Sequence, residues 1–473
     1  MDSSIIIEQS GIEFGTSGAR GLVTNFTNEV CFAFTLAFIS TQTDVKRIAV
    51  AIDNRPSSRK IAQACISAAD SLGISVDFYG VIPTPALALT AQKDSVPAIM
   101  VTGSHIPFDR NGLKFYTKIG EITKADEIKI LKASEQIIPK TPLPLPEVNK
   151  SAFNAYLKRY SDVFPSNMLE GKRIGIYQHS SSGRDLYPEL FLALGAEVIC
   201  LGYSDEFVPI DTEAVADSDR EQARRWTKKF SLDAIFSTDG DGDRPLLADE
   251  KGEYLTGDVL CMLAAKSLSI NALAVPISCI TSIERSAYFD EVVRTKIGSP
   301  YVIEALKNLI PRYDRIAGFE ANGGFLLASN IRVGSKTITS LITRDALLPV
   351  LAVFKLVQGE VLSSLIKQLP SRFTYSDRIK NIEKIKSEVI IQLGINDPVN
   401  LQSILTLGDL ILKSVNNIDG LRLIFTNNDI VHLRPSGNAP ELRCYTESKS
   451  IYDAKTLSKK VLMSIEAFIN KAK

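Results

Sequence analysis

Residues 102–111 read Thr-Gly-Ser-His-Ile-Pro-Phe-Asp-Arg-Asn and directly follow an apolar run at residues 97–101. Such a run is typical of a buried strand. A glycine and a proline then break the pattern, so Ser104 and His105 are predicted on a loop at the end of that strand. Chemistry on open α/β sheets gathers at the carboxyl ends of strands. Ser104 is therefore either a nucleophile that other residues activate or an ordinary turn serine beside a solvated histidine.

The flanking sequence predicts alternating strands and helices. One βαβ unit has its strand, helix and second strand at residues 47–52, 59–72 and 75–79. A polar turn with a helix N-cap, residues 53–58, joins the first two elements. A weak internal repeat predicts a second unit at residues 173–177, 184–194 and 197–201. Further strands are expected at residues 233–236, 273–279 and 315–319, and a further helix at residues 346–357.

The end of the chain has a different pattern. Before that end, four prolines crowd residues 139–146, and this segment is predicted to be a stiff linker or a domain boundary. Residues 421–425 and 430–433 predict a hairpin around a polar turn, and the last segment predicts an amphipathic helix. The whole pattern favours α/β domains followed by a closing α+β domain.

The composition is that of a globular protein with several domains. At 473 residues the chain is too long for one hydrophobic core, and about three or more domains are expected. Lys plus Arg equals Asp plus Glu, 54 each, so no basic excess argues for binding to nucleic acid or to an anionic membrane. Local clusters must therefore bind any anion.

We expect a cytoplasmic protein. The first ten residues lack the basic region of a secretory signal. The longest apolar windows, such as residues 30–39, are about half of the ~20 residues that a membrane span requires. The six cysteines are widely spaced without CxxC pairs, which is typical of reduced core residues rather than of disulfides or zinc ligands.

An acidic loop, Ser-Thr-Asp-Gly-Asp-Gly-Asp-Arg, follows a predicted strand. Asp239, Asp241 and Asp243 alternate with glycine and can converge on one hard cation. Oxygen ligands without histidine or cysteine favour magnesium over zinc. The aspartates also fit positions one, three and five of a calcium-binding EF-hand loop, with Glu250 at position twelve. Arg244 stands where that loop requires glycine, which argues against a calcium module and fits a site for a metal and a phosphate.

Two other loops suit a phosphate. The glycine-rich residues 11–22 let the backbone approach a ligand closely, and Arg20 is a natural partner for a phosphate. Residues 434–443 read Arg-Pro-Ser-Gly-Asn-Ala-Pro-Glu-Leu-Arg, where the hydroxyl of Ser436, backbone amides and two arginines can hold a phosphate dianion. Each loop by itself also fits an ordinary turn.

Five motifs in one order resemble the α-D-phosphohexomutase family, the phosphomannomutases and phosphoglucomutases. The motifs are Gly-Thr-Ser-Gly-Ala-Arg-Gly, Thr-Gly-Ser-His-Ile-Pro, Asp-Gly-Asp-Gly-Asp-Arg, Gly-Phe-Glu-Ala-Asn-Gly-Gly and Arg-Pro-Ser-Gly-Asn-Ala-Pro-Glu-Leu-Arg. The resemblance spans nearly the whole chain. It implies an α/β fold with three related α/β domains and a C-terminal α+β domain around a central cleft. The domain boundaries are predicted at residues 1–148, 149–264, 265–368 and 369–473.

The resemblance also implies the roles of the site residues. Ser104 would be phosphorylated in the resting enzyme, and its oxygen would join Asp239, Asp241 and Asp243 in holding Mg²⁺. Arg20 and Lys114 would lie beside the transferring phosphoryl group, and Arg244 near the phosphoserine. Lys114 is the candidate for proton transfer, with His105 as a second contributor. The substrate-binding residues would be Glu320, Asn322, Arg434, Ser436, Gly437, Asn438 and Arg443.

The implied reaction is reversible transfer of a phosphoryl group between C1 and C6 of a hexose phosphate. Phosphoserine donates its group, the resulting hexose 1,6-bisphosphate turns over, and the other phosphate returns to Ser104. Such transfer depends mainly on positioning and charge neutralisation, and closure of the last domain would exclude water. The implied cofactors are Mg²⁺ and an activating hexose 1,6-bisphosphate. The implied protein is a monomer or homodimer in carbohydrate metabolism, such as nucleotide-sugar supply.

The chain departs from the usual family motifs at several positions. Gly103 and Ile106 replace alanine and asparagine beside the serine, and Asn438 replaces a threonine in the phosphate loop. Asn322 and Gly324 stand where serine and histidine are usual in the sugar loop, although Glu320 is kept. No nucleophile, metal carboxylate or phosphate arginine is lost, so an active enzyme is expected.

The bacterial-type sugar loop with Glu320 favours mannose phosphate as the substrate. Mannose and glucose differ only in the orientation of the 2-hydroxyl, so a phosphoglucomutase or a dual-specificity mutase is the alternative. A phosphoglucosamine mutase is a further alternative. A catalytically inactive sugar-phosphate-binding protein is the alternative outside the enzymes.

Overall fold

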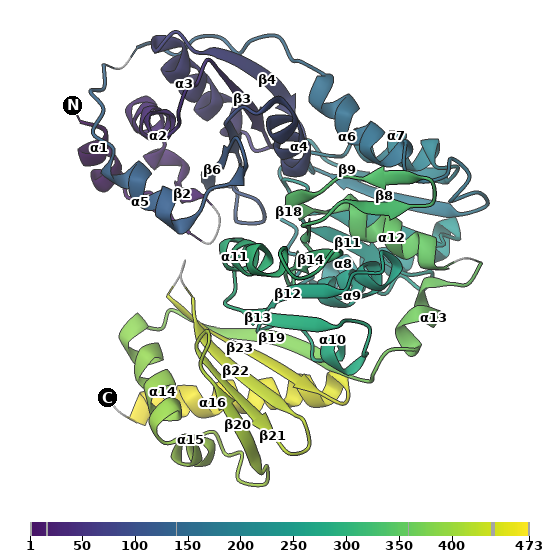
Figure 1. The fold of residues 1–473 in the computed structure, drawn as a ribbon. Helices are drawn as coiled ribbons and strands as arrows, with labels where there is room; N and C mark the ends of the chain where they lie inside the picture. The colour runs from purple at the N-terminus through teal and green to yellow at the C-terminus, as the bar shows by residue number, and fades with distance from the viewer. Residues whose placement is uncertain (1, 16–17, 139, 358, 437–439, 472–473) are drawn as a thin grey trace. The chain divides into compact units, whose positions relative to one another are not determined.

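The structure is a computed structural model of the chain, and it describes all residues except 1, 16–17, 139, 358, 437–439 and 472–473. The chain forms two compact units (Figure 1). Unit 1 comprises residues 1–273 and 298–365, and unit 2 comprises residues 274–297 and 366–473.

The N-terminal part of unit 1 is built on a mixed sheet. Its strands are β1 (Glu13–Phe14), β2 (Ala19–Leu22), β3 (Arg47–Ile52), β4 (Ser75–Val81), β5 (Ala98–Val101), β6 (Arg110–Thr117) and β7 (Gly120–Glu121). Their order is β1-β2-β6-β5-β3-β4, with β7 paired to β6. Strand β3 is parallel to β4 and β5, whereas β6 is antiparallel to β5 and β2. The helices are α1 (Ser3–Gln9), α2 (Asn28–Ser40), α3 (Ser58–Ser71), α4 (Thr84–Asp94) and α5 (Lys124–Lys132), with a 3₁₀ turn at Val23–Asn25.

Strand β3 is buried on both faces after Arg47, which explains why residues 48–52 read as a continuous apolar run. Ile48, Val50 and Ile52 belong to a core that α2 and α3 also line. Ala49 and Ala51 are buried outside that core, and side chains alternate along a strand. Helix α4 contacts β3 and β5 on this second face, where the small alanines leave room for it.

The middle of unit 1 holds a second sheet with strand order β11-β10-β8-β9. Its strands are β8 (Arg173–His179), β9 (Glu197–Tyr203), β10 (Ala234–Thr238) and β11 (Pro245–Ala248). Strand β8 is parallel to β9 and β10, and β11 is antiparallel to β10. The helices are α6 (Ser151–Ser161), α7 (Leu186–Ala193), α8 (Asp217–Phe230) and α9 (Gly257–Ser267).

The last part of unit 1 contains strands β14 (Ile316–Phe319), β15 (Phe325–Leu327) and β18 (Leu341–Asp345), in which β15 pairs antiparallel with both neighbours. Strands β16 (Ile331–Val333) and β17 (Lys336–Ile338) form a hairpin. The helices are α11 (Ser299–Leu309) and α12 (Leu347–Val357). Strand β12 (Ala272–Pro276) and helix α13 (Leu362–Lys367) each cross a boundary between the two units.

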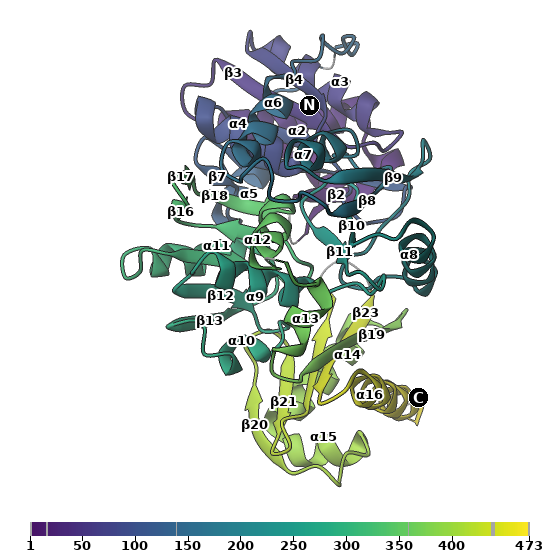
Figure 2. The same cartoon turned by 90° about the vertical axis from the view of Figure 1, so that its right-hand side faces the viewer.

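Unit 2 is an antiparallel sheet with helices on one face (Figure 2). The strand order is β19-β23-β22-β21-β20, made of β19 (Phe373–Lys380), β20 (Leu412–Asn416), β21 (Leu421–Phe425), β22 (Ile430–Pro435) and β23 (Glu441–Ser448). Helices α14 (Lys384–Asn396), α15 (Pro398–Ile404) and α16 (Ile451–Lys471) share one apolar core with this sheet. Helix α10 (Ser282–Arg285) and strand β13 (Glu291–Thr295) also belong to unit 2.

The α/β fold class and both βαβ units are confirmed, since β3-α3-β4 and β8-α7-β9 each contain a parallel strand pair. The strand predicted over residues 273–279 is wrong beyond Pro276. Cys279 N–H donates to the carbonyl of Pro276 and closes a turn there. The predicted N-cap lies at Ser57, but its side chain makes no capping bond. The four domain boundaries stay a prediction.

Several expectations about the whole chain can be compared with the structure. All six cysteines are free thiols. Within the described part of the chain, no helix is long and apolar enough to pass through a membrane. The calcium-module alternative is wrong, because the residues after the acidic loop form β11, which pairs with β10.

The core around β5 generates a stability prediction. Ile99 is fully buried in β5, whereas Ile119 is 87% exposed in the turn between β6 and β7. Ile99→Ala is expected to lower the free energy of unfolding by about 2–5 kcal/mol, since it leaves a cavity. Urea denaturation followed by circular dichroism measures the change. Ile119→Ala is the matched control, and equal losses in both variants would contradict the assigned core.

Candidate active site

The Ser104 loop lies at the carboxyl end of β5, as predicted. Ser104 is fully buried and has a left-handed backbone with φ 53°, which is costly for a residue other than glycine. Its N–H donates to Thr102 Oγ1 at 2.8 Å, and the Thr102 hydroxyl donates to Asp53 Oδ2 at 2.7 Å. The strained turn is thus tied to the end of β3, where Asp53 lies.

Arg55 binds the backbone of the same loop. Its guanidinium donates to the backbone carbonyls of Ser104 at 2.9 Å, Pro107 at 2.6 Å, Arg110 at 2.9 Å and also Ile106. A Cβ on Gly103 would lie 2.6 Å from Arg55 Cζ, so glycine makes this close approach possible. The departure from the family motif at residue 103 therefore fits the packing of Arg55.

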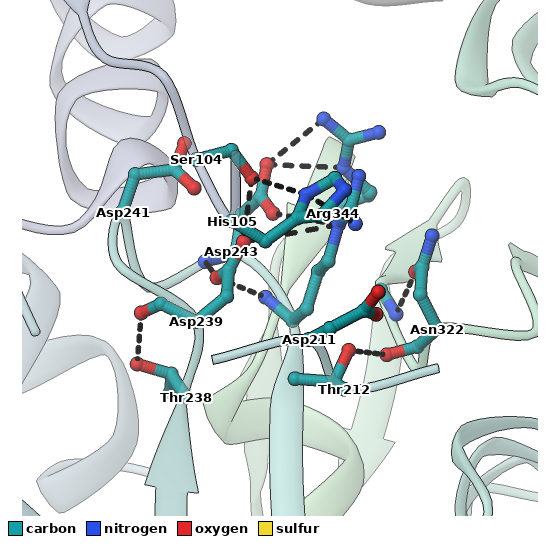
Figure 3. Close-up of polar contacts among 12 residues, drawn as sticks. Ser104, His105, Asp211, Thr212, Thr238, Asp239, Asp241, Asp243, Asn322 and Arg344 are labelled. Atoms are coloured by element: carbon teal, nitrogen blue, oxygen red, sulfur yellow. Dashed lines mark hydrogen bonds and ion pairs between the residues drawn. The ribbon is translucent and has the colours of Figure 1, made fainter. Parts of the chain in front are cut away.

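The acidic loop between β10 and β11 brings three fully buried carboxylates to the serine (Figure 3). Ser104 Oγ donates to Asp239 Oδ2 at 2.6 Å. Asp239 Oδ1 accepts the N–H groups of Asp243 and Arg244, both at 3.2 Å, which closes the loop on itself. Serine and carboxylates from separate sheets thus form one cluster.

Asp241 is held by the start of α4 and by Lys114. Thr84, the first residue of α4, donates its hydroxyl to Asp241 Oδ2 at 2.7 Å and its N–H to the Asp241 carbonyl at 2.8 Å. A helix N-terminus favours negative charge. Lys114 Nζ donates to Asp241 Oδ2 at 2.5 Å and to Asp243 Oδ2 at 2.6 Å.

The aspartate cluster fits a hard divalent cation. Carboxylate oxygens of Asp239, Asp241 and Asp243 all lie within 4.8 Å of one another. Oδ1 of Asp241 and Oδ1 of Asp243 are buried, and neither has a hydrogen-bond donor among the described residues. Buried carboxylate oxygens without donors are costly, and an oxygen-only set suits Mg²⁺. The residues present thus fit the predicted magnesium ion.

The electrostatics of the trio are uneven. Burial, with Asp241 and Asp243 close by, raises the pKa of Asp239 well above its ordinary value. Burial alone would raise the pKa of Asp241 and of Asp243 too, but Lys114 and Arg344 lower both below the ordinary value. A cation bound at the trio would favour the ionised form of Asp239.

Two arginines bring further positive charge. Arg244 Nη1 donates to His105 Nδ1 at 2.9 Å, so this histidine nitrogen accepts and the ring is the neutral Nε2–H tautomer. Burial, followed by the nearby charges of Arg244 and Arg344, lowers the pKa of Arg20 to about 10. Arg20 Nη2 is buried with no acceptor among the described residues, which fits an arriving phosphoryl oxygen.

The predicted sugar loop is the tight turn between β14 and β15. Glu320 N–H donates to the Gly324 carbonyl at 3.2 Å, and Gly324 N–H donates to Asn322 Oδ1 at 3.0 Å. Thr212 Oγ1 donates to the Asn322 carbonyl at 2.8 Å (Figure 3). Asn322 therefore closes the turn with its side-chain oxygen, while the Glu320 carboxylate meets Arg344.

The predicted phosphate loop follows β22 in unit 2. Arg434 and Arg443 are register partners on β22 and β23, so they share one face. Arg378 on β19 is the register partner of Arg443 and extends the row to three arginines. Like charges directly opposite each other are destabilising, so this row fits an anion. Gly437 and Asn438 lie outside the described residues.

Acidic partners hold the arginine row. Arg434 Nε donates to Asp419 Oδ2 at 2.8 Å, and Glu441 Oε2 lies 3.4 Å from Arg378 Nη1. Ser436 N–H donates to the Glu441 carbonyl at 2.8 Å and shapes the start of the loop. These contacts fix Arg434 and Ser436 at the start of the loop.

Comparisons with known proteins agree with this geometry. The chain matches the family phosphoglucomutase/phosphomannomutase, alpha/beta/alpha domain I, over residues 11–140 and domain III over residues 256–373. It is 51% identical to a phosphomannomutase of Salmonella muenchen, over 99% of this chain and 98% of that protein. It is 39% identical to a phosphomannomutase of Sinorhizobium fredii (strain NBRC 101917 / NGR234), over 93% and 95%.

The chain belongs to the α-D-phosphohexomutase family. This confirms the resemblance seen in the five sequence motifs. A crystal structure of a phosphoglucomutase/phosphomannomutase family protein from Burkholderia thailandensis has the same fold, with a TM-score of 0.73 at 18% identity over 98% of this chain and 97% of that chain.

The structure brings together the predicted unit 1 residues Ser104, His105, Lys114, Asp239, Asp241, Asp243, Arg244 and Glu320 through the contacts above. Sequence reasoning missed Arg55, Arg344 and Arg378. Arg55 lies in a polar turn after a predicted strand, which is a usable signal. Arg344 and Arg378 lie inside strands, and only strand register and packing reveal them.

The Arg55 clamp generates a second prediction. Arg55→Lys removes the guanidinium fork that donates to several carbonyls, and each lost hydrogen bond to a charged group is worth about 1.5–3 kcal/mol. We expect the variant to form phosphoserine at Ser104 at least about tenfold more slowly, because the loop relaxes. Mass spectrometry after incubation with a hexose 1,6-bisphosphate measures this rate.

Arg47→Lys is the control, because Arg47 on β3 makes partly exposed ion pairs with Asp77 on β4 and with Asp94 at the end of α4. A similar slowing in Arg47→Lys, or normal phosphorylation in Arg55→Lys, would contradict the clamp.

Proposed function

We propose that this protein is a phosphomannomutase, which transfers a phosphoryl group reversibly between C1 and C6 of mannose phosphate. The observation that carries the proposal is the Ser104 hydroxyl, which donates at 2.6 Å to a carboxylate of the buried aspartate trio. The two relatives named phosphomannomutase, similar along nearly their whole length, support mannose as the sugar.

The residues of unit 1 would divide the work as follows. Phosphorylated Ser104 would donate its group to a sugar hydroxyl: a new P–O bond forms to the sugar while the P–Oγ bond breaks, and the released Ser104 oxygen takes up a proton to become the hydroxyl. Lys114 would be the candidate for transfer of the sugar hydroxyl proton, with His105 as a second contributor. Arg20 and Arg244 would neutralise the phosphoryl oxygens.

The same serine would then recover the other phosphate of the bisphosphate, with the reverse bond changes. Asp239, Asp241 and Asp243, with the serine oxygen, would hold Mg²⁺, which when bound supplies positive charge for the phosphoryl group. A trace of hexose 1,6-bisphosphate would prime the serine.

Unit 2 would hold the phosphate that is not reacting. The predicted contacts are Arg434, Ser436 and Arg443, with Gly437 and Asn438 outside the described residues, and the register adds Arg378 as a third arginine. Arginine can grip two phosphate oxygens at once, which suits a phosphate that must be held in both orientations of the sugar. Glu320 would accept a hydrogen bond from a sugar hydroxyl.

The alternatives remain a phosphoglucomutase or dual-specificity mutase, a phosphoglucosamine mutase, and an inactive sugar-phosphate-binding protein. Asn322 and Gly324 in the sugar loop leave the first two open. The inactive alternative predicts that Ser104 never carries a transferable phosphoryl group. The cytoplasmic location and the monomeric or homodimeric state stay predictions.

A coupled assay tests the proposed reaction. With Mg²⁺ and a trace of glucose 1,6-bisphosphate, mannose 1-phosphate is expected to turn over faster than glucose 1-phosphate. Ser104→Ala should lose more than about 1,000-fold in kcat, as loss of a covalent nucleophile does. Ser71→Ala, a remote change at the end of α3, is the control. No turnover on either sugar by the folded wild type would refute the mutase proposal.

Metal removal tests the aspartate site. Treatment with EDTA should abolish turnover, because it removes the cation from the buried Asp241 and Asp243 oxygens. Added Mg²⁺ should restore turnover. Asp241→Asn should need higher Mg²⁺ for half-maximal rate. Full activity in EDTA, or restoration by Ca²⁺ alone, would show that the trio is not a magnesium site.

A further inference from the structure

Arg344 connects the acidic loop, which carries Asp243, with the predicted sugar loop, which carries Glu320. It lies in β18 and is buried. Its Nε donates to Asp243 Oδ2 at 3.0 Å, and its Nη2 lies 2.9 Å from the same oxygen (Figure 3). Its Nη1 donates to Glu320 Oε2 at 3.0 Å. One guanidinium therefore spans a carboxylate of the metal loop and the carboxylate of the sugar loop.

The hydrogen bonds of Arg344 occupy one oxygen of the Asp243 carboxylate and one oxygen of the Glu320 carboxylate, and leave the other oxygen of each for a ligand. Lys114 and Arg344 both donate to Oδ2 of Asp243, and Oδ1 of Asp243 is the buried oxygen that lacks a donor among the described residues. Arg344 also takes Oε2 of Glu320, so Oε1 is the oxygen that would meet a sugar hydroxyl. The guanidinium fork thereby sets how both carboxylates are turned.

Gly324 provides the space that this arginine uses. A Cβ on Gly324 would lie 2.5 Å from both Cγ and Cδ of Arg344 and 2.9 Å from its Cβ. These atoms are near the root of the side chain, so they cannot move aside without moving the guanidinium. Gly324 does not have a left-handed backbone, and the three atoms that its Cβ would meet first all belong to Arg344.

The backbone beside Arg344 is anchored by its neighbour. Asp345 accepts a hydrogen bond from Tyr156 Oη at 2.8 Å and another from Tyr160 Oη, both on α6. Asp345 Oδ1 also accepts the N–H of Leu347 at 3.0 Å, at the start of α12. With its root held by two helices, Arg344 has little freedom to place its guanidinium elsewhere.

We propose that Arg344 is a positioning residue that orients Asp243 for the metal and Glu320 for the sugar, and that Gly324 is required to admit it. The proposal rests on the proposed function for its sugar arm, but its metal arm does not. Arg344 acts through two carboxylates rather than on the reacting atoms. It thereby makes metal affinity and sugar selectivity depend on one side chain.

Two variants that are expected to fold test the proposal. Arg344→Lys keeps the charge but loses the planar fork, in which Nε and Nη2 face Asp243 while Nη1 faces Glu320. Gly324→Ala leaves the arginine in place but puts a methyl group in its path. Both are expected to weaken Mn²⁺ binding to the substrate-free protein by about 10-fold or more, as loss of a partner behind a metal ligand does. Electron paramagnetic resonance of Mn²⁺ measures this affinity directly.

Both variants should also raise KM for mannose 1-phosphate more than they lower kcat, and should change the ratio of the mannose and glucose rates. Arg332→Lys and Gly408→Ala are the matched controls. Arg332 is an exposed arginine, and a Cβ on Gly408 meets nothing within 4 Å. A merely structural role would lower the melting temperature without changing KM, sugar ratio or Mn²⁺ affinity.

The double variant Gly324→Ala/Arg344→Ala tests whether Gly324 acts through Arg344 or whether the two residues act independently. It should be worse than Arg344→Ala by less than the loss that Gly324→Ala causes alone, because Cγ and Cδ of residue 344 are removed and only its Cβ stays near the new methyl group, at 2.9 Å. Additive losses, or wild-type Mn²⁺ affinity and KM in Gly324→Ala and Arg344→Lys, would overturn the proposal. If the wild type shows no mutase turnover, the proposed function fails, and the Mn²⁺ measurements still decide the role of Arg344.

Discussion

The burial of three carboxylates beside one serine is the constraint on which the rest of unit 1 depends. Carboxylates removed from water are strongly destabilising unless cations and hydrogen bonds compensate them. Here the compensation comes from Lys114 on β6, Arg344 on β18 and the N-terminus of α4. Elements that are far apart in the sequence must therefore converge on one loop, and the apolar sheets between them hold that convergence in place.

Compensation of charge by neighbouring groups also explains the left-handed backbone of Ser104 and the row of three arginines in unit 2. Ser104 adopts a left-handed backbone because Arg55 binds the carbonyls around it, so the strain is offset by buried charge-assisted hydrogen bonds. In unit 2, Arg378, Arg443 and Arg434 lie side by side although they repel one another. Both arrangements keep charge in place in the folded chain, and charge that is already positioned lowers the cost of reorganisation when an anion binds.

Local patterns explain which parts could be predicted from the sequence. Residues 48–52 and 98–101 are apolar on both faces of their strands, so each strand and the polar loop that follows it could be predicted together. The strand predicted at residues 273–279 failed beyond Pro276, where a turn bond replaced the ladder. Arg344 was missed because a single charged residue in a strand carries no pattern, and its partners lie 24 and 101 residues away in the chain.

The sequence by itself determined the family, the α/β fold class and the contiguous loops that carry Ser104, the aspartates and the arginines proposed to bind phosphate. These features are local, since each depends on a few adjacent residues whose chemistry and spacing can be read directly. Only the tertiary structure decided which oxygens are paired, that Arg55 clamps the serine loop, and that Gly324 makes room for Arg344. Those features depend on distances between side chains on different strands, and strand register and packing set such distances only once the chain has folded.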